Sequence, residues 1–491
     1  MTSKRVFICA DHGLAVFYFL KSDIVRTLLQ AGVEVIVLTE DNTRQAVEEQ
    51  FGQPGLTIEG LRLDKIQAYL RTVSPQTQYW LDFLRRAGAH DGTNIAAVDT
   101  YIEQVKNEAH SRRRRLLPLM LATAKLMRKS RPLRRALVGY QGRFNPGIYG
   151  DLFEKYRPDL VIAGSPGFRL DRFLLREAAA RKVPSVACII SWDSSSSYGL
   201  PGATIDSITC WSEIQKSELM GGADWPADRV NVGGMPPYDG YVRKEATCPE
   251  SSEWVLPRAE YFRLHGLDPE RKLLTYASSF VNLSPNIQNI EALARLAASD
   301  QLAFPAQVLV RFHPNHMSGH FTHEADQIRQ LARENPLVHV IEPATFGAMG
   351  HYSVDDLVDR TSMMAHSDVF MTVYSTMVVE ASFQECPIVS VCIDSTTGYP
   401  GHYWIPFSKI AIWPTHSRFR ASKAGRVVTN ETELRDALNY YLLNPQADLG
   451  AIRQFRQQEC ANPDGSAGRW TAEYFLSLLQ KYESQQKGFQ K

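Results

Sequence analysis

The sequence contains no apolar run of the ~20 residues that a membrane-spanning helix requires. Its first residues lead directly into a short apolar segment, without the long hydrophobic stretch and small-residue cleavage pattern of a secretory signal. The seven cysteines are scattered and include no C-x-x-C pair, which argues against a disulfide framework and favours free thiols in a reducing compartment. We therefore expect a cytoplasmic protein.

The chain as a whole also lacks an excess of charge of either sign. Its 54 lysines and arginines balance 53 aspartates and glutamates, leaving a net charge of +1. Overall charge therefore does not favour nucleic acid or an acidic partner. Hydrophobic residues make up 44% of the 491 residues, which is typical of a globular protein, and a chain of this length usually forms two domains.

The first 38 residues read as a strand, a tight loop, a helix and a second strand. We expect strands at residues 5–10 and 33–38 with a helix at 16–31 between them, a pattern that predicts a doubly wound α/β sheet. The dinucleotide fingerprint G-x-G-x-x-G is absent from the connecting loop. Asp11 and His12 occupy that loop, where short polar residues often cap a turn or a helix.

A helical and strongly basic stretch interrupts the α/β alternation at about residues 61–150. It contains no Asp or Glu between Arg112 and Gly150, and it mixes cations with Leu, Met and Val. Its densest cluster is Arg112, Arg113, Arg114 and Arg115. This composition suits a cationic amphipathic surface for anionic lipid headgroups or a polyanionic glycan. The alternative is a solvated helix face whose arginines pair with acids elsewhere, and few aromatics are interleaved for binding nucleic-acid bases.

Alternation resumes with strands expected at residues 157–163 and 185–190, and the second of these ends in a polar loop. Trp192 and Asp193 belong to that loop. A tryptophan there could stack on a sugar face while the aspartate bonds its hydroxyls, and a plain surface loop is the equally weighted alternative.

The second half is organised around residues 368–391. A strand at 369–373 enters a polar turn, which opens a helix followed by a strand at 387–391. Ligands of such units bind at the carboxyl ends of the strands, and free N–H groups at a helix start attract phosphate. Tyr374, Ser375 and Thr376 of the turn are therefore predicted to bind a donor phosphate, and Glu380 to bond a ribose. Helix capping and a solvated face are the alternatives.

Two further strand ends carry polar residues suited to the same ligand. Residues 307–315 read as a strand that runs into a proline-stopped loop carrying Arg311 and His313. Both side chains could bind phosphate, since arginine clamps its oxygens in a fork and histidine can also move protons. Ser278 and Ser279 end the strand at 272–277 and could form a phosphate cradle. A structural histidine, hydrogen-bonded within its loop, is the alternative for His313.

The order of these motifs resembles the C-terminal half of the GT-B nucleotide-sugar transferases. The resembling segments are Arg-Phe-His-Pro, Tyr-Ser-Thr with Glu-Ala, Cys-Pro-Ile, the linking Gly-Met-Pro-Pro-Tyr-Asp-Gly240 and the closing Asp464-Gly-Ser-Ala-Gly-Arg469. They are most similar to the branch of CDP-glycerol glycerophosphotransferases and other surface-polysaccharide enzymes. Ser191-Trp-Asp resembles a Ser-Trp-Asp-Asn run of surface-carbohydrate enzymes, with Ser194 in place of the Asn.

The resemblance implies a GT-B fold of two Rossmann-like domains facing a cleft. Residues 1–240 would form the acceptor domain with the basic insertion, residues 241–465 the nucleotide-donor domain, and residues 466–491 a helix packing back on the first domain. The first loop of many such enzymes faces the acceptor, which makes His12 and Asp11 candidates for the base, beside His313. The implied activity moves a sugar or polyol-phosphate unit from a nucleotide-activated donor to a surface glycan or lipid-linked acceptor. We expect no requirement for a metal or other cofactor, because a helix dipole and basic side chains can stabilise the leaving diphosphate. We also expect the enzyme to be cytoplasmic, free or peripheral on the membrane.

Other functions remain open. Nucleotide-sugar 2-epimerases share the fold, but their Ser-Gly-Gly run before the helix is replaced here by Tyr374-Ser-Thr. A metal-dependent hydrolase would use the imidazoles of His313, His316, His320 and His323, although Pro314 and Gly319 disfavour one continuous helix there and H-E-x-x-H is absent. A catalytically silent binding protein would use the same site for nucleotide without turnover.

Overall fold

The computed structural model describes residues 3–109, 111–242, 254–279, 285–317, 322–343, 345–346, 351–352, 354–395 and 404–489. The chain forms two compact units, each built on its own sheet. The first comprises Met1–Asp239, Phe346–His351 and Cys460–Lys491, and the second comprises Gly240–Thr345 and Tyr352–Glu459. Both sheets are parallel and flanked by helices, which confirms the predicted α/β class.

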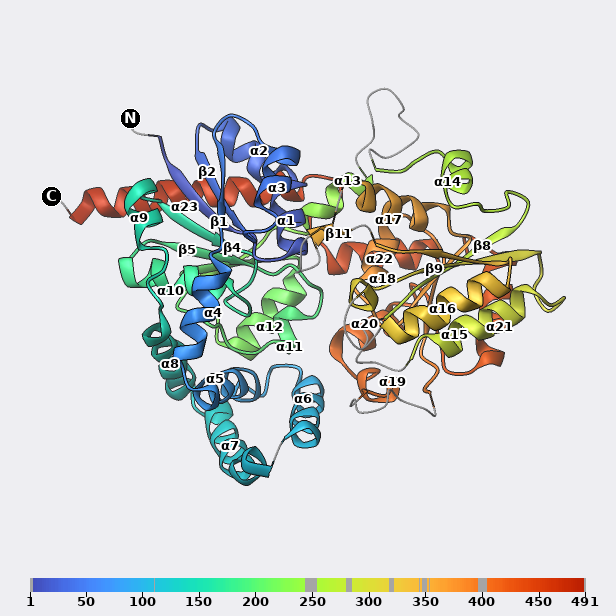
Figure 1. Ribbon diagram of the computed structural model, residues 1–491, viewed down its shortest axis with the longest axis horizontal. Coiled ribbons are helices and arrows are strands. Elements are labelled where there is room, and N and C mark those ends of the chain that lie inside the picture. The colour runs from blue at the N-terminus through green and yellow to red at the C-terminus, as the bar shows by residue number, and fades with distance from the viewer. Residues whose placement is uncertain are drawn as a thin grey trace. The chain divides into compact units, whose positions relative to one another are not determined.

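The first unit contains a seven-stranded sheet of order β3-β2-β1-β4-β5-β6-β7. Figure 1 labels β1, β2, β4 and β5 of this sheet. The strands are β1 (Arg5–Cys9), β2 (Glu34–Thr39), β3 (Leu56–Gly60), β4 (Leu160–Ala163), β5 (Ser185–Cys188), β6 (Ser207–Cys210) and β7 (Val230–Val232). Val6 of β1 pairs in parallel with Val35 of β2 and with Leu160 of β4. Residues 6–9 are fully buried, as expected for a parallel strand covered on both faces.

Helices of the first unit cover this sheet and extend from it. They are α1 (Gly13–Leu20), α2 (Asp23–Gln30), α3 (Arg44–Phe51), α4 (Leu63–Thr72), α5 (Pro75–Ala87), α6 (Ile95–Glu108), α7 (Ser111–Lys129), α8 (Arg131–Tyr140), α9 (Gly150–Tyr156), α10 (Asp171–Arg181), α11 (Ser194–Ser197), α12 (Glu213–Ala223) and α23 (Ala467–Phe489). Three 3₁₀ turns are η1 (Gln141–Phe144), η2 (Ala227–Arg229) and η3 (Pro236–Tyr238). The chain passes to the second unit within α13 (Asp239–Val242).

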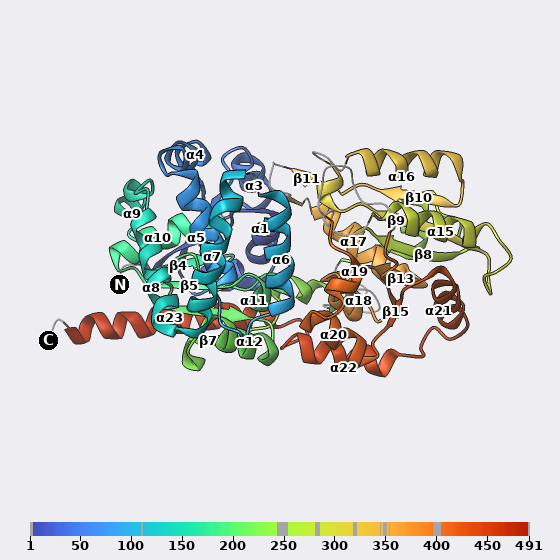
Figure 2. The same cartoon turned by 90° about the horizontal axis from the view of Figure 1, so that it is seen from below.

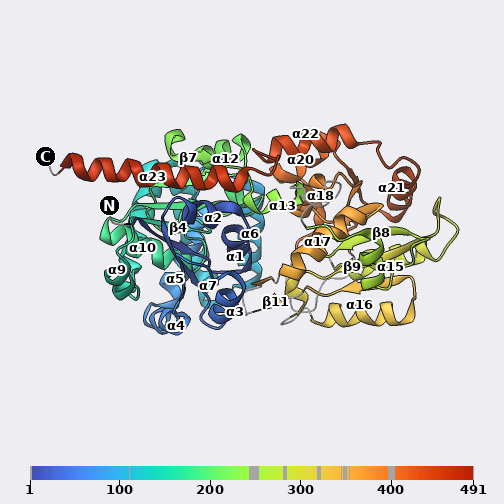
Figure 3. The ribbon, with the colours of Figure 1, turned by 90° about the horizontal axis from the view of Figure 1, so that it is seen from above.

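The C-terminal helix α23 belongs to the first unit and packs along α2 (Figure 3). Its first turn is capped by Asp239, whose carboxylate accepts hydrogen bonds from the backbone N–H groups of Ala467 (3.0 Å) and Gly468 (2.7 Å). An acidic side chain at a helix start also interacts favourably with the helix dipole. Asp239 thereby ties the last helix to the segment that leaves the first unit.

The single helix expected at residues 16–31 is wrong in one respect, because the structure has two helices there. α1 ends at Leu20, and α2 starts after Ser22, whose Oγ accepts the N–H of Ile24 (3.3 Å). Serine is among the favoured residues at a helix N-cap. The cap restarts the helix at a break that the hydrophobic pattern does not reveal.

The basic insertion is helical, as predicted, and consists of α4 to α8 (Figure 2). It has a small core of its own, in which Leu117, Met120 and Ala124 of α7 pack with Phe83 of α5 and Val98 of α6. The spacing of three and four residues along α7 places these side chains on one helix face. The opposite face of α7 is left outside this core.

The second unit contains a six-stranded parallel sheet of order β10-β9-β8-β13-β14-β15. Its strands are β8 (Lys272–Ala277), β9 (Ala306–Arg311), β10 (Val338–Ile341), β13 (Val369–Thr372), β14 (Ile388–Val391) and β15 (Arg426–Val428). Leu274 of the central strand β8 pairs with Val308 of β9 and Val369 of β13. The chain reverses its direction of winding at β8, so a ligand site is expected at the carboxyl ends of β8 and β13.

The strand-turn-helix-strand unit predicted in the second half is confirmed as β13, α18 (Met377–Phe383) and β14. The other helices are α14 (Arg258–Leu264), α15 (Ile287–Ala297), η4 (Pro314–Met317), α16 (Thr322–Glu334), α17 (Val354–His366), α19 (Phe407–Ile410), α20 (Pro414–Ser422), α21 (Glu431–Leu443) and α22 (Leu449–Glu459). β11 (Thr345–Phe346) and β12 (His351–Tyr352) pair with each other. Within the described ranges, no helix has the length and hydropathy needed to cross a membrane.

Gly202 tests the close approach between its own loop and the loop after β4, which contains Gly167. A Cβ at this position would lie 1.9 Å from the carbonyl oxygen of Gly167 in the loop after β4. We expect Gly202→Ala to lower the free energy of unfolding by ~1–3 kcal/mol because neither backbone can yield without moving its loop. Chemical denaturation monitored by circular dichroism measures the change.

Gly139→Ala in α8 is the matched control, because a Cβ there meets no heavy atom within 4 Å. Replacing a helix-interior glycine with alanine should stabilise the protein by up to ~1 kcal/mol. Equal stability of Gly202→Ala and the wild type would contradict the close approach of the two loops.

Candidate functional site

The loop after β1 places a histidine and a carboxylate in direct contact. Nδ1 of His12 lies 2.7 Å from Oδ1 of Asp11, and both side chains are buried, with exposures of 4% and 0%. Burial raises the pKa of Asp11, but the hydrogen bond and charge of His12 outweigh it, so the pKa lies below its usual value. Asp11 is therefore ionised, and it holds the proton of the imidazole on Nδ1.

A second carboxylate, Asp171 at the start of α10, completes this cluster. Its backbone N–H donates to Oδ2 of Asp11 (3.1 Å), and its own Oδ2 accepts from Oγ of Ser165 (2.7 Å) and from the N–H of Gly167 (3.3 Å). Burial and the nearby charge of Asp11 raise the pKa of Asp171 to about 7. β1 and β4 are neighbours at which the winding of the sheet reverses, so this cluster occupies the place where ligands bind such sheets.

This geometry suits a general base. A histidine whose Nδ1–H is held by a carboxylate has a fixed tautomer and presents Nε2 to a proton donor, and the carboxylate stabilises the imidazolium that forms. Asp11 and His12 are among the predicted catalytic residues, whereas Ser165 and Asp171 are not. The signal for them was the Gly164-Ser-Pro-Gly loop that ends a buried strand and is followed by a helix starting with Asp.

Trp192 and Asp193, the residues predicted to bind the acceptor in the loop after β5, differ in how deeply they are buried. Trp192 is 2% exposed and its carbonyl accepts from Nε2 of Gln215 (3.1 Å), so its ring is part of the core and has no free face for a sugar. The sequence suggested that Trp192 stacks on a sugar because a tryptophan at the end of a strand can be either exposed to a ligand or buried in the core. Asp193 is half-buried and accepts a hydrogen bond from Oγ of Ser191 (2.8 Å).

Two arginines at the end of α5 make contacts that the sequence does not reveal. Nη1 of Arg85 donates to the carbonyls of Tyr198 (2.7 Å) and Leu200 (3.2 Å). The guanidinium of Arg86 lies over the rings of Tyr101 (4.4 Å) and Tyr198 (5.6 Å). Nothing in the described chain gives Arg86 an ion pair, and its buried Nε has no hydrogen-bond partner there. Among the described residues, the charge of Arg86 is therefore stabilised by aromatic faces.

In the second unit, the polar end of β8 is tied to the loop after β9. Ser279 donates from its backbone N–H (2.8 Å) and its Oγ (3.0 Å) to Oδ1 of Asn286. Glu324 of α16 in turn accepts from the amide of Asn286 (3.3 Å) and lies 2.7 Å from Nε2 of His316. Ser279 therefore shapes the loop, while Ser278 Oγ and His316 Nδ1 are buried without a partner in the described chain.

His313 and Arg311 are close in sequence but differ in their surroundings. His313 is half-buried, and burial together with the neighbouring His316 lowers its pKa to about 4. Arg311 is 5% exposed and its two terminal nitrogens contact Asp356 (2.5 Å) and Asp359 (3.0 Å). A phosphate could reach this guanidinium only by displacing a carboxylate, so the contact of Arg311 with a donor stays a prediction.

The turn between β13 and α18 is shaped by its own hydrogen bonds. Oγ of Ser375 accepts the N–H of Met377 (3.2 Å), as a capping residue does, and Thr376 is half-buried beside it. Tyr374 has a left-handed backbone with φ of 35° and stacks on His416 with ring centroids 4.3 Å apart. The turn is therefore held rigidly at the end of β13.

Glu380 of α18 is not on a solvated face, because it is only 6% exposed. Its Oε2 accepts from the hydroxyl of Tyr241 (2.7 Å) and lies 3.5 Å from Nε of Arg360. A buried carboxylate needs such partners to remain charged. The predicted contact with a ribose would be made by a side chain that is already oriented.

The histidines that suggested a metal site differ in their surroundings. His316 is buried on Glu324, His323 is exposed, and His320 lies outside the described residues. Among the residues that the structure places, no three His, Cys, Asp or Glu side chains gather in a way that could hold a metal ion.

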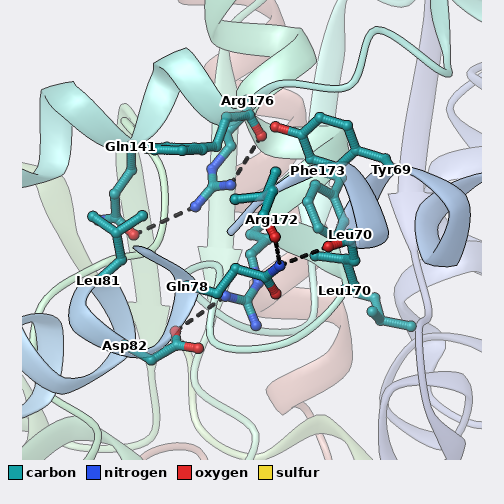
Figure 4. Close-up of a pocket in the computed structure, with 12 residues that line it drawn as sticks. Tyr69, Leu70, Gln78, Leu81, Asp82, Gln141, Leu170, Arg172, Phe173 and Arg176 are labelled. Carbon is teal, nitrogen blue, oxygen red and sulfur yellow. Dashed lines mark hydrogen bonds and ion pairs between the residues drawn. The ribbon is translucent and has the colours of Figure 1, made fainter. Parts of the chain in front are cut away.

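A cavity of about 90 Å³ lies in the first unit between α4, α5, η1 and α10 (Figure 4). Its polar residues bond to one another. Arg172 donates to Asp82 (3.1 Å), Arg176 to Gln141 (3.4 Å), and Gln78 to the carbonyl of Leu70 (2.7 Å). A drug-sized ligand needs roughly 300 Å³ or more, so this cavity does not hold a nucleotide sugar.

Comparison with protein-family models and with curated protein sequences finds no match. Solved structures do match. The UDP-GlcNAc 2-epimerase of Neisseria meningitidis, bound to UDP-GlcNAc, has a TM-score of 0.50 at 12% identity over 96% of this chain and 100% of that one. MnaA of S. aureus with UDP has 0.52 at 14% over 97% of each chain. The Methanocaldococcus jannaschii 2-epimerase with UDP-GlcNAc and UDP has 0.52 at 10% over 97% and 99%. The chain has the GT-B fold.

His313 allows a direct test of the electrostatics in the second unit. We expect its imidazole to stay neutral until the pH falls toward about 4, because burial and His316 disfavour the charged form. The unfolded chain binds this proton near pH ~6.5. The free energy of unfolding should therefore fall as the pH drops from ~6.5 toward about 4. NMR titration of the imidazole, assigned with His313→Gln, measures the pKa. A titration midpoint near that of a free histidine would contradict the structure.

Proposed function

We propose that the protein transfers a sugar or a polyol-phosphate unit from a nucleotide-activated donor to a hydroxyl of a glycan or lipid-linked acceptor. The observation that carries this proposal is the buried pair of His12 and Asp11 at the carboxyl end of β1. An inverting transferase needs a base for the acceptor, and this pair has the geometry of one.

The proposed step is a direct displacement. Nε2 of His12 takes the proton of the acceptor hydroxyl as its oxygen bonds to the transferred group, and the bond to the leaving nucleotide phosphate breaks. Asp11 stabilises the imidazolium through Nδ1. Asp171 supports Asp11 through its backbone N–H, and its raised pKa limits the negative charge next to the base at neutral pH.

The donor is proposed to bind the second unit, at the carboxyl ends of β8, β9 and β13. Ser278, Thr376 and the backbone of the turn at Tyr374 and Ser375 would bind the phosphates, and Glu380 the ribose. The buried, unpartnered Ser278 Oγ in the described chain supports this site, because such a group usually has a hydrogen-bond partner. His313, kept neutral by its low pKa, would donate a hydrogen bond to a phosphate oxygen. The helix dipole and these donors can stabilise the leaving group without a metal. That group is a nucleoside diphosphate in sugar transfer and a nucleoside monophosphate in polyol-phosphate transfer.

Acceptor recognition is proposed for the first unit. Arg86 has no acidic partner among the residues described, so it is suited to a phosphate or carboxylate of the acceptor. Asp193 is near Tyr198, whose pKa its charge raises, and could bond a sugar hydroxyl. A CDP-polyol donor and a surface-polysaccharide acceptor would agree with the motif resemblance, and the enzyme would then work in the cytoplasm.

A nucleotide-sugar 2-epimerase is the second candidate. It is favoured by the solved UDP-GlcNAc 2-epimerases of Neisseria meningitidis and Methanocaldococcus jannaschii, which match 96% and 97% of this chain. An epimerase would use the same nucleotide site but would remove and return a proton on the donor sugar itself. It would need no acceptor.

A screen for the bound nucleotide and an analysis of the reaction product distinguish a transferase from a 2-epimerase. We expect one of UDP, CDP or GDP and its sugar or glycerol conjugate to raise the melting temperature in the presence of EDTA, since no metal is proposed. Incubation of the conjugate alone should leave it unchanged under a transferase, whereas an epimerase would convert it to its 2-epimer, seen by NMR. Absence of any nucleotide-dependent stabilisation would exclude both functions.

Replacing the proposed base should separate binding from chemistry. We expect His12→Ala to lower the turnover number by ~10²-fold or more, while the dissociation constant of the donor stays unchanged because His12 belongs to the other unit. His323→Ala, at an exposed histidine of the second unit, is the control. Steady-state kinetics and calorimetry measure the two quantities, and wild-type turnover in His12→Ala would remove this residue from the mechanism.

A further inference from the structure

The outward face of α7 carries apolar side chains that the fold leaves in solvent. Leu119 is 59% exposed and Leu126 is 60% exposed. They are seven residues apart, which places them on the same helix face. The buried face of the same helix is formed by Leu117, Met120 and Ala124, so α7 is apolar on two opposite sides.

Exposed apolar side chains are concentrated on α7 and the helix that follows it, α8; both helices are labelled in Figure 1. Of the twelve large apolar side chains described as exposed, five lie in this short segment. The other three are Leu116 (43%), Leu133 (40%) and Tyr140 (47%), on α7 and α8. Single exposed leucines are ordinary, but such a concentration marks an interaction surface.

Positive side chains surround the patch. Exposed cations of α7 and α8 are Arg114, Arg115, Lys125, Lys129, Arg131 and Arg135. Arg115 and Lys129 continue the stripe of Leu119 and Leu126 at intervals of three and four residues, so they bracket it. The side chains of Arg112 and Arg113 lie outside the described residues.

Two other arginines of this segment are bonded within the fold, unlike the cations on its outward face. Arg134 is 3% exposed and pairs with both carboxylate oxygens of Asp224 (2.6 and 2.8 Å). Nε of Arg128 donates to the carbonyl of Ala87 (2.8 Å). These two arginines hold the insertion together. By contrast, Arg114, Arg115 and Lys129 have no ion pair within the described chain, and no acidic residue occurs between Arg112 and Gly150.

We propose that this face of α7 and α8 docks on an anionic lipid surface, with Leu119 and Leu126 entering the headgroup region and the flanking cations contacting lipid phosphates. A helix that lies on a bilayer has this combination of apolar stripe and basic flanks. A polyanionic glycan or a nucleic acid would use the cations but leave the leucines in water. The lipid surface satisfies both, which is why it is the occupant that the chemistry favours.

The size of the effect can be anticipated. Each Lys or Arg near an anionic membrane should strengthen binding about 5-fold, and each exposed leucine that becomes buried should strengthen it about 10- to 100-fold. Either group alone would give weak binding, whereas both together give reversible attachment that salt weakens. This inference does not depend on the proposed transferase activity, because it concerns partition and not turnover.

Vesicle co-sedimentation tests the proposal with the full-length protein. We expect binding to vesicles of equal parts phosphatidylcholine and phosphatidylglycerol and little binding to phosphatidylcholine alone. Leu119→Ser combined with Leu126→Ser should weaken binding at least ~10-fold, since ~1.4 kcal/mol corresponds to a factor of ten. Arg115→Gln combined with Lys129→Gln should weaken it by a similar factor and reduce its dependence on salt.

A matched control uses leucines of equal exposure elsewhere. Leu264 is 62% exposed and Leu443 is 61% exposed, and both belong to the second unit. Leu264→Ser with Leu443→Ser should bind vesicles like the wild type. Circular dichroism and the melting temperature of each variant show whether the fold is kept, which is expected because the replaced side chains face solvent.

Three results would overturn the proposal. Vesicle binding by the wild type that is unchanged in both patch variants would place the lipid contact elsewhere. Binding to heparin without binding to vesicles would make the face a polyanion site. A concentration-dependent dimer, seen by light scattering and lost in the leucine variant, would mean that a second copy of the chain covers the patch.

Discussion

The parallel pairing of two central strands is the constraint on which the candidate site depends. β1 lies between β2 and β4, and β8 lies between β9 and β13, with every pair parallel. Parallel strands end at the same edge of a sheet, so the polar loops that follow them are gathered there. Asp11 and His12 meet Asp171 for this reason, although 160 residues separate the two aspartates. Ser278 reaches the strand of His313 in the same way, through its N–H on the carbonyl of Arg311 (2.9 Å).

Burial decides which charged groups are free to act. Arg311 and Arg134 are almost fully buried and each is held by carboxylates, because an unpaired charge in the interior is costly. Arg86 is held by aromatic rings and has no acid within the described chain, which leaves its charge for a ligand. The same physics raises the pKa of Asp171 and lowers that of His313. Function on this fold is thus proposed for the groups whose charge the fold does not neutralise.

In the insertion, one face of α7 packs into a core and the opposite face is exposed to solvent. Leu117 and Met120 of α7 build its packed core, while Leu119 and Leu126 point the other way. The internal core makes the insertion a stable platform, and the outward face is then available for a partner without loss of stability.

Sequence alone determined the α/β class, the two parallel sheets, the helical basic insertion and the loops in which Asp11, His12 and His313 lie, because periodicity and turn residues are local signals. It did not show the break at Ser22, the burial of Trp192, or the ion pairs that engage Arg311 and Glu380. It also missed Asp171 and Arg86 as members of a site. Those features depend on which residues, distant along the chain, become neighbours when the strands pair and the helices pack. Only the tertiary structure decides burial and charge pairing, since both are properties of a residue's surroundings and not of its identity.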